Sequence, residues 1–193
     1  PPRVGAADRV DHDVGAAPPG ELAHRRYDRL VVYGGFADSY YRNYPELWVL
    51  PLAEQPLRWI QVPPDTSPQH WPGDFAFAGA AMTPDGTRMV MFGGTRSLGT
   101  LEHAQTWELD LETLRWSMIP TAPEATPSGR MGHALLTDPS RGGVLMLPGQ
   151  DHNSSAGERR RSWVYDADAR TWHLLSTQSE EQVGYGGYAA ARD

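Results

Sequence analysis

The sequence contains no cysteine, which excludes disulfide bonds and thiolate metal sites within the chain. It has no apolar run near the ~20 residues that a membrane-spanning helix needs, so we expect no membrane partner. Basic residues are the minority: 17 lysines and arginines stand against 24 aspartates and glutamates, and the net charge is −7. Because nucleic acids bind basic faces, this charge argues against a nucleic-acid partner.

No segment shows a convincing helical period of apolar residues. The 193 residues instead include 20 glycines, 17 prolines and seven tryptophans. The tryptophans argue against a disordered chain, and the composition is typical of many short strands joined by tight turns. The length suits one good-sized domain or several small repeats.

One unit occurs three times along the chain. In its middle copy, the apolar residues 89–92 end in Gly93 and Gly94, and Trp107, Asp110 and Trp116 follow a variable loop. The equivalent residues are Gly34, Gly35, Trp48 and Trp59 in the first copy, and Gly149, Trp163, Asp166 and Trp172 in the third. The closing tryptophans lie 57 and 56 residues apart, a period that indicates a repeat architecture.

The third copy opens with Arg130, Gly132 and His133, spaced as Arg-x-Gly-His. Together with the paired glycines, the turn aspartates and the tryptophans, this motif resembles the kelch repeat. The resemblance implies an all-β fold, a kelch-type β-propeller, present as a partial ring of four-stranded antiparallel blades. It implies blades at residues 13–72, 73–128 and 129–182, a lead-in loop or the end of a preceding blade at 1–12, and the first strand of a further blade at 183–193.

The three copies do not match the kelch pattern equally well. Pro148 replaces the first glycine of the third copy, and Pro51 stands where the first copy should have its turn aspartate. In the second copy, Gly79 and Ala80 stand where Gly-His is expected. The first copy is expected to open with a strand at residues 14–17.

Most of the motif residues are expected to have structural roles. Large aromatics favour the interior, so the tryptophans should form the core between blades. The paired glycines allow a sharp turn near the crowded axis, and Asp110 can hold its turn by accepting backbone hydrogen bonds. His133 is expected to be a hydrogen-bonded packing residue rather than a metal ligand. Three blades cannot close a ring, so we expect further blades from the same parent chain or from another chain.

The candidate binding residues lie in the loops that follow the second strands, because loops on a rigid scaffold commonly carry recognition. Aromatics there suit an interface, and an arginine run can clamp an acidic peptide. A cation site around His152 is a weaker alternative, and simple loop packing or solvation remains open for all of these side chains. The candidates are Tyr40, Tyr41, Arg42, Arg96, His152 and Arg160.

No nucleophile elbow and no phosphate-binding glycine loop is present in the sequence. We therefore expect a non-enzymatic protein–protein interaction module or scaffold with a protein partner, without catalytic residues, metal or other cofactor. The resemblance leaves an alternative, a carbohydrate-active or sugar-binding propeller that is mutarotase-like, or oxidase-like without the Cys-Tyr copper cofactor. We expect a soluble protein, with the cytoplasm favoured over other compartments.

Overall fold

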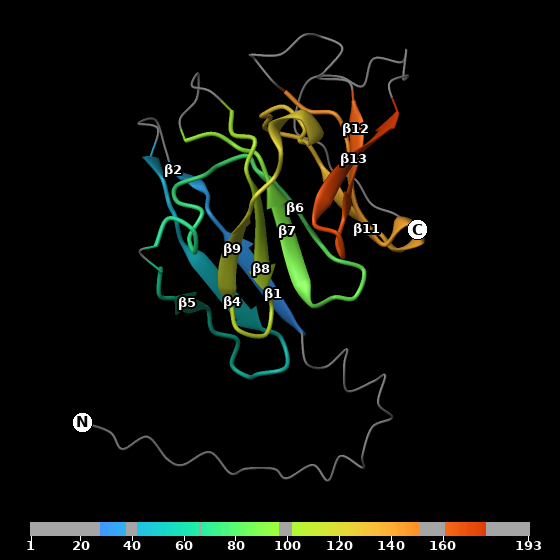
Figure 1. Cartoon of the computed structure of the whole chain (residues 1–193). Helices are drawn as coiled ribbons and strands as arrows, with labels where there is room; N and C mark the ends of the chain where they lie inside the picture. The colour runs from blue at the N-terminus through green and yellow to red at the C-terminus, as the bar shows by residue number, and fades with distance from the viewer. Residues whose placement is uncertain (1–27, 38–41, 66, 97–101, 151–160, 177–193) are drawn as a thin grey trace, which may run out of the picture.

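The computed structural model describes residues 28–37, 42–65, 67–96, 102–150 and 161–176. These residues form thirteen β-strands and two short 3₁₀ helices, η2 (Pro123–Ala125) and η3 (Pro139–Arg141), with no α-helix among them. Figure 1 shows three antiparallel sheets side by side in chain order. We refer to them as blades one, two and three. No helix in this part of the chain has the length and apolar character needed to cross a membrane.

Blades two and three each contain four strands, arranged in the sheet in chain order. Blade two consists of β6 (Gly79–Met82), β7 (Arg88–Phe92), β8 (Thr106–Asp110) and β9 (Arg115–Ile119). Blade three consists of β10 (Leu135–Asp138), β11 (Gly143–Met146), β12 (Ser162–Asp166) and β13 (Thr171–Ser176). The innermost strands β6 and β10 contact each other, as expected for neighbouring blades around a common axis.

Blade one has three described strands, namely β1 (Arg29–Tyr33), β4 (Leu47–Pro51) and β5 (Ile60–Val62). The strand that the sequence predicts at residues 14–17 lies outside the described residues. Two short strands, β2 (Phe36–Ala37) and β3 (Arg42–Asn43), pair as a separate ribbon between β1 and β4. The loop after β1 therefore contains a small hairpin, which the sequence did not predict.

The glycine that follows β1 and the glycine that follows β7 occupy equivalent places. Gly34 and Gly93 have φ angles of 72° and 73°, a left-handed conformation that favours glycine. A Cβ on Gly34 would collide with the carbonyl of Phe75, and a Cβ on Gly93 would collide with the carbonyl of Arg130. Each of these glycines thus lets the end of a second strand pass closely against the entry of the next blade.

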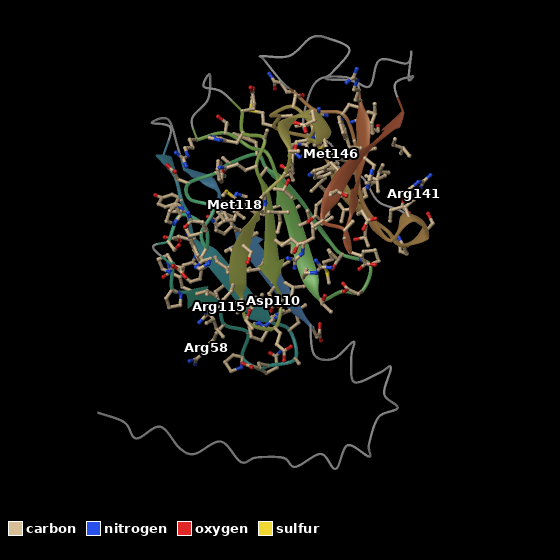
Figure 2. All side chains as sticks on the ribbon, in the orientation of Figure 1. Arg58, Asp110, Arg115, Met118, Arg141 and Met146 are labelled. Carbon is tan, nitrogen blue, oxygen red and sulfur yellow. The ribbon has the colours of Figure 1, made fainter. Side chains whose placement is uncertain are left out.

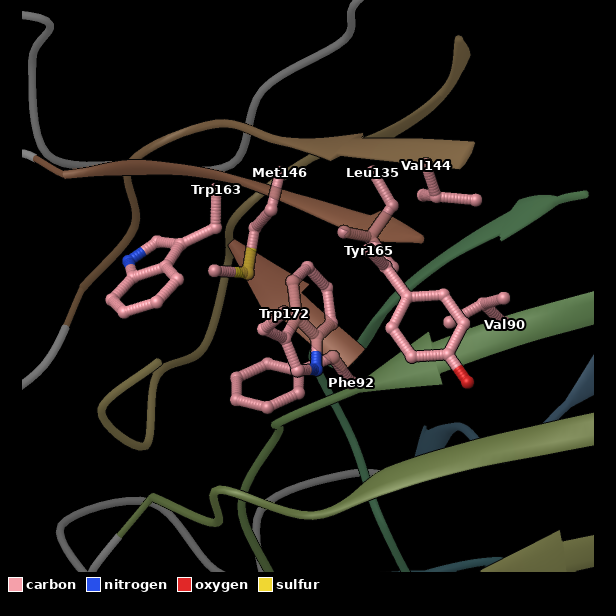
Figure 3. Close-up of a cluster of buried hydrophobic side chains, with 8 residues drawn as sticks. All are labelled: Val90, Phe92, Leu135, Val144, Met146, Trp163, Tyr165 and Trp172. Atoms are coloured by element: carbon pink, nitrogen blue, oxygen red, sulfur yellow. The ribbon is translucent and has the colours of Figure 1, made fainter. Parts of the chain in front are cut away.

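The same aromatic contact holds each pair of neighbouring blades together. Tyr33 packs against Trp116 with ring centroids 4.9 Å apart, and Phe92 packs against Trp172 at 5.2 Å. Figure 3 shows Phe92 beside Trp172 within the cluster between blades two and three. In both cases the closing tryptophan of one blade meets the aromatic residue that ends the second strand of the preceding blade.

In the described structure this contact has no counterpart at Trp48 and Trp59, so their place in a core between blades stays a prediction. Trp59 is 47% exposed and Trp48 is only partly buried, whereas Trp107 and Trp163 are buried. The reason is geometric: the closing tryptophan is covered by the preceding blade, and no described residue lies on that side of blade one. Trp48 faces the same way, because it occupies the strand position of Trp107.

A buried carboxylate distinguishes the interface between blades two and three. The Glu108 side chain is 3% exposed and accepts hydrogen bonds from Tyr165 Oη at 2.8 Å and Arg88 Nη1 at 2.9 Å. Arg170 Nε lies 3.3 Å from its other oxygen. Burial, followed by the nearby Glu108 charge, raises the pKa of Tyr165 far above its usual value and keeps it a hydrogen-bond donor. Blade one has Val49 at the position equivalent to Glu108.

Candidate recognition surface

The predicted recognition loops all leave the sheets at one end. Strands β1, β7 and β11 finish there, and β6 and β10 begin there. We call this the loop end, formed among the described residues by 34–37, 42–46, 73–78, 93–96, 102–105, 129–134 and 147–150, and it is uppermost in Figure 1. The opposite end, formed by residues 83–87, 110–114, 138–142 and 166–170, is called the turn end.

Only one candidate binding side chain is visible at the loop end. Tyr40, Tyr41, His152 and Arg160 lie outside the described residues. Arg42 lies in the ribbon strand β3, where only the backbone is described. Arg96 is described with its side chain, at the start of the loop after β7, so the following geometry concerns Arg96 and its neighbours.

The Arg96 side chain is exposed and stands over an aromatic pair. Its Cζ lies 5.5 Å from the centroid of the Phe75 ring, and its Nε lies 3.7 Å from Asp74 Oδ1. The His103 ring meets Phe75 edge-on, with centroids 4.7 Å apart. Burial, followed by the Arg96 charge, lowers the pKa of His103, so the histidine is neutral at pH 7 and Arg96 supplies the positive charge.

Arg130 lies beneath the surface and joins neighbouring loops through hydrogen bonds. Its side chain is fully buried and donates from Nε and Nη2 to Ser128, at 3.1 and 3.0 Å, and from Nη1 to the carbonyl of Arg161, at 3.2 Å. Its own carbonyl accepts a hydrogen bond from the amide of Gly94 at 2.8 Å. Arg130 therefore fixes the entry of blade three against the glycine pair of blade two and the approach to β12.

His133 is buried close to Arg130 and packs in the interior, as expected. Neither ring nitrogen makes a hydrogen bond of good geometry, although the backbone of Phe92 lies close enough to favour the protonated ring. The ring instead fills a space left by glycines, since a Cβ on Gly79 would lie 2.7 Å from its Nε2. Burial, followed by the Arg130 charge, lowers the pKa of His133 to about 3. Within the described ranges, no group of three or more His, Cys, Asp or Glu side chains is placed to hold a metal ion.

The strand register changes the alignment of the Arg-x-Gly-His motif. Just before their first strands, Ala76 pairs with Thr95 in blade two and Met131 pairs with Gln150 in blade three. The residue after each is therefore equivalent, which places Phe77 at the position of Gly132. Our prediction that Gly79 and Ala80 take the Gly-His positions was wrong.

Phe77 is the surface residue that the sequence analysis missed. Its φ of 60° matches the 62° of Gly132, and its side chain is 47% exposed at the loop end. A phenylalanine in a glycine position hides the motif from residue matching. The spacing would have revealed it. Phe77 lies 16 residues before Gly93, and Gly132 lies 16 residues before Pro148, the equivalent position after the second strand of blade three.

The sequence matches the KLHDC2/KLHL20/DRC7 Kelch-repeats domain over residues 11–191. The chain belongs to the kelch-repeat family. A solved structure, that of YjhT, superposes with a TM-score of 0.57 at 14% sequence identity, covering 82% of this kelch chain and 50% of YjhT. At that identity the likeness shows the fold alone, and with the family match it confirms the kelch-type β-propeller.

Two plant proteins are similar in sequence to this kelch chain, both from Oryza sativa subsp. japonica. Adagio-like protein 3 is 29% identical over 182 residues, which cover 89% of this chain and 27% of the relative. A second, adagio-like protein 2, is 31% identical over 145 residues, which cover 71% of this chain and 21% of the relative. The chain thus spans about a quarter of the length of these curated relatives.

Proposed function

We propose that this kelch propeller is a protein-interaction module that contacts a protein partner through its loop end. Membership of the kelch family supports the proposal, since kelch domains commonly bind proteins. The observation that carries it is the exposed Arg96 guanidinium, held over Phe75 at the loop end. Exposed arginine is enriched at protein interfaces, and here the buried Phe75 ring holds it in place.

The scaffold beneath this surface is suited to hold it rigidly. Blade two is packed on both faces, with one hydrophobic cluster against blade one and another against blade three. Phe75, which supports Arg96, is 2% exposed and belongs to the first cluster. Loops on such a scaffold can vary in sequence without disturbing the sheets, which suits recognition. The proposed surface also includes the other candidates, because they lie in the sequence within the loops that follow the second strands: Tyr40, Tyr41, Arg42, His152 and Arg160.

The carbohydrate-active alternative gains no support from the described residues. A sugar site at the axis would need polar side chains on the innermost strands. The side chains of β6 are all apolar or absent. In β10, Thr137 donates its hydroxyl to the carbonyl of Met82 at 2.8 Å, and the buried Asp138 accepts from Ser140 and Arg141. We therefore do not propose a second function, and a cytoplasmic location stays a prediction.

We also propose that a further blade packs on the open face of blade one. Leu30, Val32 and Trp59 are 49%, 39% and 47% exposed on that face. They lie on the face of blade one that points away from blade two. Apolar side chains gathered on one face favour burial against another element. The covering blade can belong to the same parent chain or to another chain, and native mass spectrometry of the parent protein distinguishes the two.

The interaction proposal is tested by a hydrogen-exchange footprint. Partners are captured with the full chain, purified, and added back at saturating concentration while amide exchange is followed by mass spectrometry. We expect slower exchange in peptides covering residues 93–105 and 73–78, and unchanged exchange in those covering 110–114 and 166–170. Protection confined to the turn end, or to the outer strands β5, β9 and β13, would contradict the proposal.

A further inference from the structure

The outer strand of blade two has a backbone edge that faces away from its sheet. The fourth strand of a blade is the outermost one, so the blade repeat places no strand beyond β9. The amide of Met118 leaves the sheet and donates to the carbonyl of Gln69 in the connector at 3.0 Å. In an antiparallel ladder, the backbone groups of residues two apart point the same way, so the amide and carbonyl of Trp116 also face outward.

The connector between blades one and two covers only part of this edge. Gln69 meets the edge at Met118, within a turn that is closed by a hydrogen bond from the amide of His70 to the carbonyl of Ser67, at 2.9 Å. The outward amide and carbonyl of Trp116 have no hydrogen-bond partner among the described residues. The next connector differs, because its helix η2 contacts the outer strand β13. Unpaired backbone groups at a sheet edge are a template for pairing with another chain.

A groove of 540 Å³ includes Trp116 in its lining, a volume within the range that suits a bound ligand. Its other wall comes from the connector, with Pro63, Pro64 and Trp71. The two prolines have no amide hydrogen, and Trp71 already donates its indole N–H to the carbonyl of Pro45 at 3.1 Å. These three residues therefore offer apolar contacts, and the backbone of β9 offers the hydrogen bonds that an extended chain in the groove needs.

Asp65 supplies a carboxylate to the same groove. Its Oδ1 accepts from the amide of Ser67 at 2.8 Å, and its Oδ2 lies 3.6 Å from His70 Nδ1, a long contact between two exposed side chains that contributes little. Arg115 also lines the groove, but alternation along β9 turns its side chain to the face opposite Trp116. The carboxylate and the net charge of −7 therefore favour a positively charged ligand.

We propose that the edge of β9 binds an extended peptide segment of a protein partner, with a lysine or arginine of the segment at Asp65. One residue of the segment exchanges hydrogen bonds with the amide and carbonyl of Trp116, so the segment adds a strand to blade two. The backbone bonds supply affinity, and Asp65 supplies the preference for a basic segment. The site lies on the outer strand, apart from the loop end, so the inference goes beyond the proposed function.

The test uses a capped peptide, acetyl-Thr-Val-Lys-Val-Thr-amide, and two matched versions of it. In one version the central residues are N-methylated and cannot donate backbone hydrogen bonds, and in the other glutamate replaces the lysine. Each peptide is titrated into the isotope-labelled full chain while amide NMR shifts are followed. We expect saturable shifts at His70, Leu114 and Trp116, with the Trp116 amide moving downfield as it gains a hydrogen bond. Both matched versions should bind at least fivefold more weakly.

Two substitutions separate the charge from the groove. Asp65→Asn keeps an acceptor for the amide of Ser67 but removes the charge, so it should abolish the preference for the lysine peptide over the glutamate peptide. Pro64→Trp narrows the groove and should weaken binding at least fivefold, with an unchanged thermal midpoint because Pro64 is exposed. Asp168→Asn is the matched control: Asp168 is an exposed acidic residue in a turn of blade three, so peptide binding should not change.

Three results would overturn the inference. The first is equal binding of the N-methylated peptide, which would exclude strand pairing. The second is a set of shifts that does not include Trp116. The third is absent binding of the lysine peptide. In that case, slow solvent exchange of the Trp116 amide would show that the chain's own residues cover the edge, or a second copy if dilution restores fast exchange. The loop-end footprint uses a different ligand, so the proposed function stands or falls independently of these results.

Discussion

The two ends of the sheets are held together by different kinds of contact. At the turn end, each turn is closed by its own side chain. Asp110 Oδ1 accepts from the amides of Glu112 and Thr113 at 2.9 and 2.7 Å, and Asp166 Oδ1 accepts from those of Asp168 and Ala169 at 2.9 and 2.8 Å. Figure 2 labels Asp110 at this end of blade two.

At the loop end, the backbone is fixed by the neighbouring blade. The amide of Gly94 donates to Arg130 of blade three, and the amide of Gly132 donates back to Phe77 of blade two. The buried Arg130 side chain adds contacts to Ser128 and Arg161. The turns of the turn end are therefore closed by local sequence, with Arg88 adding one bond to the carbonyl of Ala167 in the next blade at 2.9 Å, whereas the backbone of the loop end is fixed by blades that are distant in the chain. A surface fixed from below in this way leaves its outer side chains available for binding.

The largest effect is expected in the scaffold between the two ends, where closing tryptophans pack on the preceding blade. Trp116→Ala should destabilise the chain by about 3–5 kcal/mol, since the residue is 1% exposed and contacts Tyr33. Trp59→Ala, its matched control in blade one, should cost less than about 1 kcal/mol in the isolated monomer. Chemical denaturation measures both. An equal loss would show that another blade already covers Trp59.

A pair of glycines compares the ends directly. Gly93 at the loop end and Gly142 at the turn end have φ of 73° and 66°, but only Gly93 meets a neighbour, the carbonyl of Arg130. Gly93→Ala should cost about 2–4 kcal/mol from strain and overlap. Gly142→Ala should cost about 1 kcal/mol, from backbone strain alone. Similar denaturation midpoints for the two variants would argue against close contact between the blades at the loop end.

Acid should act on the loop end first, through His133. Its pKa is lowered from the usual 6.5 to about 3 in the folded state, so between these pH values the unfolded chain binds a proton and the folded chain does not. Stability is therefore lost as the pH falls from about 6.5 towards 3, by at most about 1.4 kcal/mol per pH unit. Denaturation at several pH values should show a shallower slope for His133→Gln. An unchanged slope would contradict the buried, neutral histidine.

The turn end should respond later and more weakly. Hydrogen bonds, the amide of Thr113 foremost, lower the pKa of Asp110 below 3.8, so its contribution is present above that pH and is lost as the pH falls through the folded value. Asp110→Ala should cost about 1 kcal/mol at pH 7, because two turn amides lose their acceptor. The difference between the variant and the parent should shrink as the pH falls below 3.8 and vanish once the folded-state carboxyl is protonated. A difference that stays constant as the pH falls would show that the carboxylate charge is irrelevant to the turn.

The sequence predicted the parts of the fold that depend on local pattern. The apolar run 89–92, the turn around Asp85 and Gly86 and the aspartate turn at Asp110 all form as expected, because neighbouring residues specify them. Local sequence could not predict how far Trp59 is buried, nor which residue of blade two is equivalent to Gly132 at the loop end. Trp59 depends on a neighbouring blade, and Phe77 occupies a glycine position that only the pairing of Ala76 with Thr95 reveals.

The central claim is that binding occurs at the loop end, and two exposed arginines of blade two test it most directly. Arg96 lies at the loop end and Arg115 at the turn end, where Figure 2 labels it beside Asp110. Calorimetry should measure the affinity of the purified partner for the parent chain, Arg96→Glu and Arg115→Glu. We predict at least tenfold weaker binding, about 1.4 kcal/mol, for Arg96→Glu and an unchanged affinity for Arg115→Glu. The reverse pattern, with Arg115→Glu impaired and Arg96→Glu normal, would contradict the claim.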